Sequence, residues 1–314
     1  MLPEKVKSLL KKQHYAIVGN HSAVQICRWT KKSLLDEDFC YKQKFYGIQS
    51  HRCCQMSPAV MWCQHRCIFC WRPIELTLGD KIEGKVDDPK SIVDGCIEAQ
   101  RKLLVGFGGN KKCNKKKLRE AFYPKHFAIS LSGEPTIYPY ISELIAELKR
   151  RKITSFLVTN GMLPQVLERI EMPTQLYVSL DAPNEKLYKK IDRPVTGSWK
   201  KLQETLELLQ DLKKKTRTVI RITAIKGLNM KNEKEYARLI EKANPLFVEV
   251  KAYMAVGFSR KRLGLKFMPS HEEVKEFSKK ISEHSSYKLV DEKENSRVVL
   301  LMEEDTKERK IKFD

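Results

Sequence analysis

Short apolar runs alternate with amphipathic segments along most of this chain. From about residue 56, runs of four to seven mostly apolar residues have the length of buried strands. Between them, apolar residues recur every three or four positions, the spacing of one helix face. The predicted strands are Ala59–Trp62, Phe127–Ser132, Ser155–Thr159, Leu176–Leu180, Val219–Ile225 and Phe247–Tyr253, and the predicted helices are Ile141–Arg150, Pro164–Ile170, Trp199–Lys213, Glu233–Ala243 and His271–Glu283.

This alternation predicts an α/β protein built on a parallel sheet. Six strand–helix units are too few for a complete TIM barrel, which has eight, so we predict an incomplete TIM-type barrel, (β/α)6. The predicted domains are an N-terminal extension at 1–55, a core at 56–286 with a basic insertion at about 100–126, and a strand-rich tail at 287–314. In the tail, two strands could form a hairpin around Glu294 and Asn295.

Polar residues follow the predicted strands directly. Cys63 follows the first strand, Gly133 and Glu134 follow the second, Asn160 follows the third, and Asp181 ends the fourth. In barrel enzymes the carboxyl ends of the strands build the active site. We therefore expect these residues to mark one catalytic end of the sheet.

Composition indicates the cellular compartment of the protein and the state of its cysteines. The chain has 314 residues, 41% of them hydrophobic, with no apolar run long enough to cross a bilayer and no signal-peptide pattern at its start. These features predict a cytoplasmic protein that does not enter a membrane. Cysteines stay reduced in that compartment and can bind metal. Seven of the nine cysteines fall between Cys27 and Cys70, which favours metal ligands over scattered core thiols.

The net charge of +21 predicts a polyanionic partner, and we favour nucleic acid. A lysine-rich thermophile proteome would also be basic, but there glutamate would match lysine, which it does not do here. A membrane surface is disfavoured because the densest basic run has no apolar face. Candidate phosphate contacts, each of which could instead be an ordinary solvated residue, are Lys111, Lys112, Lys115, Lys116, Lys117, Arg119, Arg260, Lys261 and Arg262.

Three cysteines, Cys63, Cys67 and Cys70, form a C-x3-C-x2-C run with the aromatic Phe69 before the last. Three thiolates on one loop can hold three irons of a 4Fe-4S cluster and leave the fourth open to a small molecule. A structural zinc site would normally pair such a loop with a second pair of ligands, and none follows here. The segment resembles the signature loop of radical S-adenosylmethionine (SAM) enzymes.

That resemblance implies residues that bind SAM. Ser132-Gly133-Glu134-Pro135-Thr136 resembles the family's segment that binds the methionine amino group, and Ser179-Leu180-Asp181 resembles its ribose-contacting stretch. Each segment is also compatible with an ordinary turn or strand end. The cofactor-binding residues expected are Phe69, Gly133, Glu134, Thr136, Asn160, Ser179 and Asp181.

A second set of cysteines, Cys27, Cys40 and Cys53, has the regular spacing C-x12-C-x12-C and suggests a second 4Fe-4S cluster with its own open iron. Cys54 adjoins Cys53 and is an alternative ligand, although the spacing favours Cys53. The arrangement resembles the archaeal tRNA 4-demethylwyosine synthase family. Local similarity extends over nearly the whole chain, including Phe39-Cys40-Tyr41-Lys42, His51-Arg52-Cys53-Cys54-Gln55-Met56, Glu249-Val250-Lys251-Ala252-Tyr253-Met254 and Met268-Pro269-Ser270-His271-Glu272-Glu273.

This second resemblance implies an activity. The family converts N1-methylguanosine, beside the anticodon of phenylalanine tRNA (tRNA-Phe), into the tricyclic base 4-demethylwyosine, with two carbons from pyruvate. A radical formed from SAM removes hydrogen from the N-methyl group, and the second cluster is expected to hold pyruvate. Lys42, close in sequence to Cys40, is the candidate Schiff-base lysine, although it could be one more solvated cation. An external electron donor and a monomeric enzyme are also expected.

Two other functions remain open at this stage. One is a different radical SAM enzyme that modifies RNA, such as a methylthiotransferase, which has other cysteine spacing and an added RNA-binding domain. The other is a non-catalytic iron–sulfur module that binds RNA, which would need neither the Gly-Glu-Pro segment nor six strand–helix units.

Overall fold

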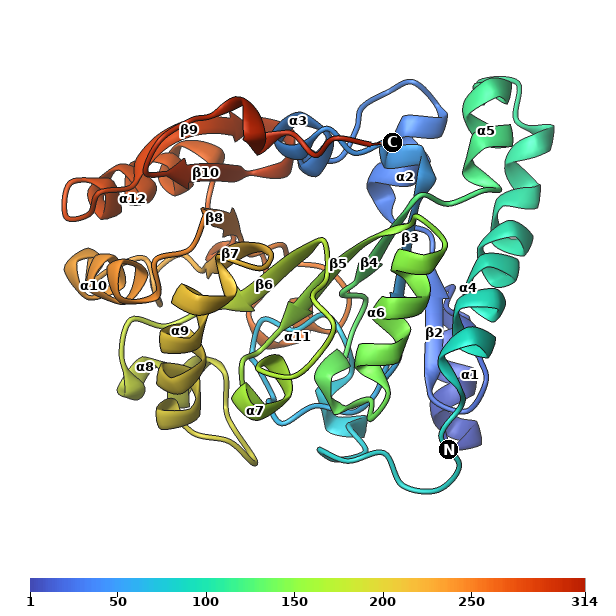
Figure 1. Cartoon of the computed structure of the whole chain (residues 1–314), viewed down its shortest axis with the longest axis horizontal. Helices are drawn as coiled ribbons and strands as arrows, with labels where there is room; N and C mark the ends of the chain where they lie inside the picture. The colour runs from blue at the N-terminus through green and yellow to red at the C-terminus, as the bar shows by residue number, and fades with distance from the viewer. Residues whose placement is uncertain (314) are drawn as a thin grey trace. The chain divides into compact units, whose positions relative to one another are not determined.

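The computed structural model describes residues 1–313, which fall into two compact units (Figure 1). Unit 1 contains Met1–Cys63, Leu78–Val158 and Arg169–Thr174. Unit 2 contains Gln64–Thr77, Thr159–Glu168 and the chain from Gln175 onward.

The sheet of unit 1 has the strand order β1-β2-β3-β4-β5. The first two strands lie antiparallel, and β2 is also antiparallel to β3. The β3–β4 and β4–β5 pairs are parallel, with Cys53, His126 and Thr154 in register. The strand bounds are β1 Ala16–Val18, β2 Ser22–Gln25, β3 Cys53–Ser57, β4 His126–Ile129 and β5 Thr154–Thr159.

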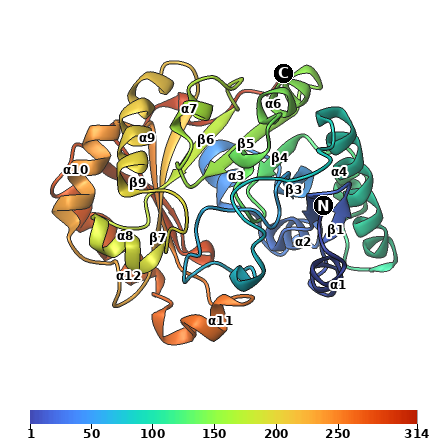
Figure 2. The same ribbon diagram turned by 90° about the horizontal axis from the view of Figure 1, so that it is seen from below.

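One long helix, α4, covers the antiparallel edge of this sheet by packing on β1, β2 and β3 and also on α6, as Figure 2 shows. Its start is encoded locally: Asp88 accepts a hydrogen bond from the Ser91 amide, and Pro89 occupies the first turn. The helical segments of unit 1 are α1 Glu4–Lys12, α2 Arg28–Leu34, α3 Tyr41–Tyr46, η1 Ser50–Arg52, α4 Pro89–Leu104, η3 Val105–Gly109, α5 Lys115–Ala121, η4 Pro135–Ile137 and α6 Ile141–Arg150.

The sheet of unit 2 has the order β6-β7-β8-β10-β9. The β6–β7 and β7–β8 pairs are parallel, whereas β10 runs antiparallel to both β8 and β9. The strand bounds are β6 Gln175–Ser179, β7 Arg217–Ala224, β8 Phe247–Ala252, β9 Lys288–Lys293 and β10 Val298–Met302.

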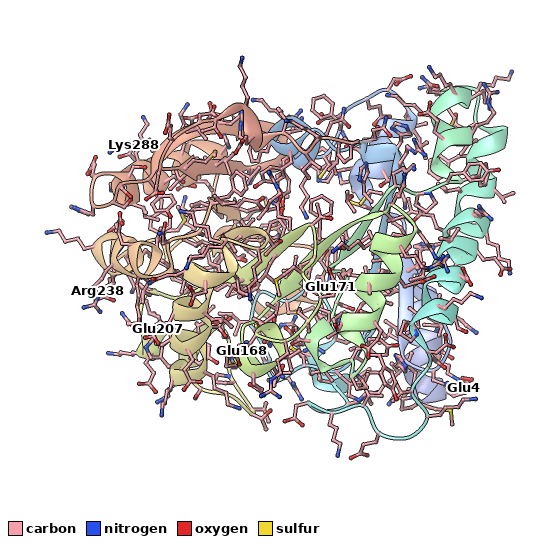
Figure 3. All side chains as sticks on the ribbon, viewed as in Figure 1. Glu4, Glu168, Glu171, Glu207, Arg238 and Lys288 are labelled. Carbon is pink, nitrogen blue, oxygen red and sulfur yellow. The ribbon has the colours of Figure 1, made fainter. Side chains whose placement is uncertain are left out.

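The helices of unit 2 bury apolar residues and direct charged ones outward. Helix α10 packs against α9 and α12, and α12 also contacts β8 and β10. A capping box between Ser270 and Glu273 starts α12. Charged residues such as Glu207 and Arg238 extend into solvent (Figure 3). The helical segments are η2 Ile74–Leu76, α7 Pro164–Leu167, α8 Glu185–Ile191, α9 Trp199–Leu212, α10 Glu233–Ala243, α11 Ser259–Arg262, η5 Leu265–Phe267, α12 His271–Ser282, η6 Glu294–Ser296 and η7 Lys307–Arg309.

The parallel strands confirm the predicted α/β class, and β9 and β10 confirm the predicted hairpin. The first predicted strand, Ala59–Trp62, was wrong, because the strand is Cys53–Ser57. Residues 59–62 form a buried turn instead, in which the Trp62 amide donates to the Ala59 carbonyl. Within residues 1–313, none of the helices is long and apolar enough to span a bilayer.

Candidate active site: two cysteine sets and their surroundings

Burial divides the nine cysteines into two groups. The six cysteines predicted as ligands are all partly exposed. Cys54, Cys96 and Cys113 are buried, as expected of core thiols.

The second set comes together at one place in unit 1. Cys27 and Cys40 immediately precede α2 and α3, and Cys53 is the first residue of β3. Burial raises the pKa of the Cys53 thiol, Cys27 and Cys40 raise it further, and Lys42 lowers it. These influences put Cys27, Cys40 and Lys42 each within electrostatic reach of Cys53.

The neighbouring Cys54 lies on the opposite face of β3, because successive strand residues alternate. Burial raises the pKa of its thiol, and the nearby thiol of Cys96 on α4 raises it further. The structure therefore brings Cys53, not Cys54, together with Cys27 and Cys40.

Lys42 is buried, with only 8% of the residue exposed. Its Nζ lies 4.8 Å from the centre of the Phe156 ring on β5, a cation–π distance. Lysines desolvated in apolar surroundings are the type that forms Schiff bases with carbonyl substrates. The alternative of a solvated surface lysine does not fit this burial.

Backbone packing holds the segment that leads to Cys63. The Cys63 amide donates to the Gly79 carbonyl over 2.8 Å, and the Glu134 amide donates to the Trp62 carbonyl over 2.7 Å. Gly133 has φ 72°, and a Cβ there would lie 1.9 Å from the Ala59 carbonyl oxygen. Only glycine fits this approach. The predicted Gly-Glu-Pro segment thus contacts the chain that carries the first cysteine.

Glu134 is buried, and Thr136 orients its carboxylate. Its Oε1 accepts from the Thr136 amide over 3.1 Å and from the Thr136 hydroxyl over 2.7 Å. A carboxylate fixed in this way has lone pairs left for another donor.

In unit 2, the loop that bears Cys67 and Cys70 rests on the end of α8. The Arg66 amide donates to the Asp192 carbonyl, and the Cys67 Sγ lies 3.4 Å from Asp192 Oδ1. Burial raises the pKa of the Asp192 carboxyl, and Asp181 raises it further. Ligand atoms of His65, Cys67 and Asp192 lie within 4.8 Å of one another. Sequence reasoning missed Asp192, since no local motif marks it.

Arg262 of α11 holds the same loop. Its guanidinium donates to the carbonyls of Ile68, Cys70 and Arg72, and it lies 3.2 Å from a Glu75 carboxylate oxygen. This geometry gives Arg262 a structural task that the prediction of a phosphate contact did not foresee. The neighbouring Arg260 and Lys261 are exposed.

The other predicted SAM contacts lie at strand ends in unit 2. Asn160 donates to the Gln64 side chain over 3.1 Å, and Ser179 ends β6 with its side chain partly exposed. Asp181 Oδ1 accepts from the Thr223 amide over 2.7 Å, and burial raises the pKa of Asp181 to about 6. Asn229, which sequence reasoning missed, donates to the Asp181 carbonyl.

The basic insertion presents most of its cations to solvent. Lys111, Lys112, Lys116 and Arg119 are exposed. Lys115 is exposed but donates to the carbonyls of the preceding turn, at residues 108 and 110. Lys117 is half-buried, and its Nζ lies 2.5 Å from Asp36 Oδ1.

Comparison with known proteins shows the family of this chain. A family model described as the radical SAM superfamily matches residues 58–240, and one described as wyosine base formation matches residues 242–303. A SAM-dependent tRNA 4-demethylwyosine synthase from Pyrococcus abyssi is 52% identical over 97% of this chain and 90% of its own. The Methanocaldococcus jannaschii enzyme is 44% identical over 98% of both chains. A solved structure of TYW1 with a lysine–pyruvate adduct bound has a TM-score of 0.87 and 42% identity, covering 99% of this chain and 98% of that one.

The fold and the cysteine loop define a radical SAM enzyme, which uses SAM and an iron–sulfur cluster. Its substrate is a tRNA. The chain belongs to the family of SAM-dependent tRNA 4-demethylwyosine synthases.

The residues present fit iron–sulfur clusters. Each set offers three partly exposed thiols, and Cys27 and Cys40 disfavour the thiolate form of Cys53. Three such thiols gathered together are stable as thiolates when a positively charged metal group binds them.

Proposed function

We propose that this enzyme makes 4-demethylwyosine from N1-methylguanosine in tRNA-Phe by adding two carbons of pyruvate held on Lys42. The observation that carries the proposal is the buried Lys42 beside Cys27, Cys40 and Cys53. The similar TYW1 structure with a lysine–pyruvate adduct supports a lysine of this kind as the pyruvate carrier.

In the proposal, Cys63, Cys67 and Cys70 hold the first 4Fe-4S cluster. When bound, this cluster and SAM supply a carbon radical that takes hydrogen from the methyl group of the substrate base. An external donor provides the electron.

The chain's own residues then hold SAM in place. Glu134, fixed by Thr136, accepts from the ammonium of the methionine moiety, and Gly133 keeps that backbone close. Ser179 and Asp181 accept from the ribose hydroxyls, while Asn160 and Phe69 complete the binding residues.

The second set, Cys27, Cys40 and Cys53, would hold a second 4Fe-4S cluster, whose open iron would suit the oxygen atoms of pyruvate. Lys42 Nζ attacks the ketone carbon, and water leaves as the imine forms. The imine carbon stays fixed because the lysine side chain packs on Phe156.

The tRNA lies against exposed cations. The anticodon loop can splay out a base, which chemistry on that base requires. Because Lys117 and Arg262 are half-buried and each lies beside a carboxylate, we assign the phosphate contacts to the predicted cations that are exposed, Lys111, Lys112, Lys115, Lys116, Arg119, Arg260 and Lys261.

Mass spectrometry of tRNA nucleosides tests the proposal. Reconstituted enzyme would be incubated without oxygen with methylated tRNA-Phe, SAM, reductant and pyruvate. We expect 4-demethylwyosine together with 5′-deoxyadenosine. Deoxyadenosine without this product would support another radical SAM reaction, such as methylthiotransfer. Neither compound would support a non-catalytic RNA-binding module.

A further inference from the structure

Helix α5, which carries the exposed Lys115, Lys116 and Arg119 of the basic insertion, is firmly packed within unit 1. Its buried residues Leu118 and Ala121 belong to one apolar cluster with Ile26 and Leu34. Ile26 directly precedes Cys27, and Leu34 ends α2. The apolar side of α5 therefore rests on the segment that begins at the first cysteine of the second set.

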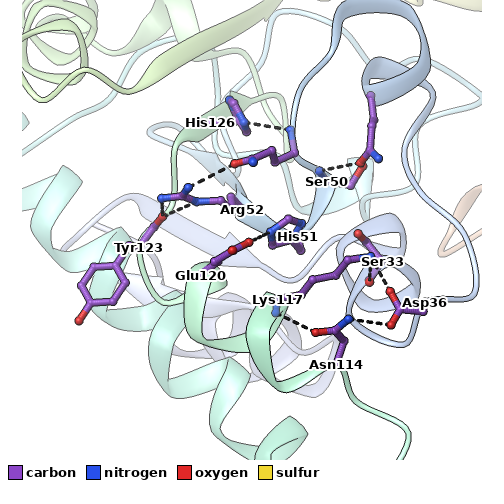
Figure 4. A network of polar contacts seen from close by, with 12 residues as sticks. Ser33, Asp36, Ser50, His51, Arg52, Asn114, Lys117, Glu120, Tyr123 and His126 are labelled. Atoms are coloured by element: carbon purple, nitrogen blue, oxygen red, sulfur yellow. Dashed lines mark hydrogen bonds and ion pairs between the residues drawn. The ribbon is translucent and has the colours of Figure 1, made fainter. Parts of the chain in front are cut away.

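A polar contact fixes the N-terminal end of α5 to the end of α2. Asp36 accepts from Lys117 Nζ over 2.5 Å through one oxygen and from the Asn114 side chain over 2.8 Å through the other. Lys117 also donates to the Ser33 carbonyl, and the Asn114 amide donates to the Leu34 carbonyl. Figure 4 shows this contact.

A second contact fixes the other end of α5 to the short helix η1. His51 Nε2 lies 2.6 Å from a Glu120 carboxylate oxygen, and His51 is buried. Arg52 donates through two nitrogen atoms to the Tyr123 carbonyl, just beyond α5 (Figure 4). The Lys125 amide donates back to the Arg52 carbonyl over 3.0 Å.

Helix η1 in turn contacts Cys40 and the helices α2 and α3 that follow Cys27 and Cys40. The Cys40 amide donates to the Ser50 hydroxyl over 2.9 Å, and that hydroxyl donates to Gln43 of α3, the helix that carries Lys42. The Ser50 carbonyl accepts from Thr30 of α2. Cys53 follows η1 directly.

We propose that Asp36, His51 and Glu120 are positioning residues, which fix RNA bound on α5 at a set distance from Lys42 and the second cysteine set. This inference rests on the proposed function. Phosphate contacts position a nucleic acid without acting on its bases. A rigid link between those contacts and Lys42 would hold the splayed base at the pyruvate carbon. Misplacement by about 1 Å can cost roughly 100-fold in rate.

Loosening the link should separate binding from product formation. The exposed cations would still hold tRNA, and Lys42 would still take pyruvate. The base would no longer be held at the reacting carbon, so SAM would be cleaved without a matching yield of 4-demethylwyosine.

The test compares the double variant Asp36→Ala/Glu120→Ala with Asp36→Asn/Glu120→Gln, which keeps the shape of each side chain and one of its two acceptor oxygens. Glu98→Ala is the matched control, since Glu98 forms an exposed ion pair with Lys102 on α4. The measurements are thermal unfolding, tRNA affinity, borohydride trapping of pyruvate on Lys42, and the ratio of 4-demethylwyosine to 5′-deoxyadenosine.

For the double alanine variant we expect a ratio roughly tenfold lower, with tRNA affinity within about twofold of the wild type and undiminished trapping. The variant Asp36→Asn/Glu120→Gln should have a ratio of 4-demethylwyosine to 5′-deoxyadenosine between those of the double alanine variant and the wild type. Glu98→Ala should have the same ratio as the wild type. An unchanged ratio would overturn the inference. So would a parallel loss of affinity and trapping, which would mean a purely structural role. Absence of product from the wild type would instead refute the proposed function.

Discussion

At the scale of single residues, function divides neighbours that look alike in the sequence. Cys53 joins the second set, whereas Cys54 is a core thiol beside Cys96. Spacing predicted this choice, because the regular interval between ligands is a local property of the sequence. The hydrogen bonds from Arg262 to the cysteine loop were not predicted, because their acceptors are backbone carbonyls nearly two hundred positions earlier in the chain. Hydrogen bonds between residues so far apart in the chain produce no local sequence motif.

Arg262→Met should destabilise the protein by about 2 kcal/mol, since three carbonyls of the cysteine loop would lose a charged donor. Iron bound after reconstitution should fall as well. Urea unfolding and iron analysis measure both effects. The exposed Arg260→Met is the control and should stay within about 0.5 kcal/mol of the wild type. Equal behaviour of the two variants would remove the structural task assigned to Arg262.

At the scale of elements, strongly periodic segments were predicted well. Helices α6 and α10 have the predicted bounds. Strand β3 was missed because its polar Cys53, Cys54 and Gln55 break the apolar pattern. The short helices α2, α3 and α5 were not predicted either, since their ends depend on tertiary contacts rather than on periodicity. The second cysteine set was thus visible, but its supporting elements were not.

Two glycines with similar backbone conformation test the role of the segment after β4. Gly133 and Gly227 both have φ 72°, but only at Gly133 would a Cβ strike backbone atoms. Gly133→Ala should cost about 3 kcal/mol or more and abolish SAM binding. Gly227→Ala should cost about 1 kcal/mol and leave SAM binding intact. Chemical unfolding and anaerobic calorimetry with SAM measure these effects, and equal losses would contradict the assignment.

At the scale of the whole molecule, the excess of positive charge was the signal for a nucleic-acid partner, and family membership agrees with it. Charge alone could not say which cations face RNA. The structure separates exposed side chains such as Lys116 from Lys117, which is held by Asp36. That distinction depends on how each side chain packs in the folded protein, which cannot be read from a run of consecutive lysines.

Charge reversal tests where the RNA binds. The variant Lys111→Glu/Lys112→Glu/Lys116→Glu should weaken tRNA binding and reduce the slope of log affinity against log salt by about 2. Lys200→Glu/Lys201→Glu/Lys234→Glu has the same net charge and also alters exposed lysines, so it corrects for overall charge. Salt titrations of tRNA binding provide the measurement. If both variants lose affinity equally, the basic insertion is not the RNA-binding surface.

The central claim is that Lys42 carries pyruvate beside the second cysteine set. The most direct measurement is borohydride trapping of ¹³C-pyruvate on the reconstituted enzyme, followed by peptide mass spectrometry. We expect one labelled lysine, Lys42. The label should be lost in Lys42→Ala and retained in Lys44→Ala, because Lys44 is an exposed lysine on the same helix. Label on another lysine, or undiminished labelling and product in Lys42→Ala, would contradict it.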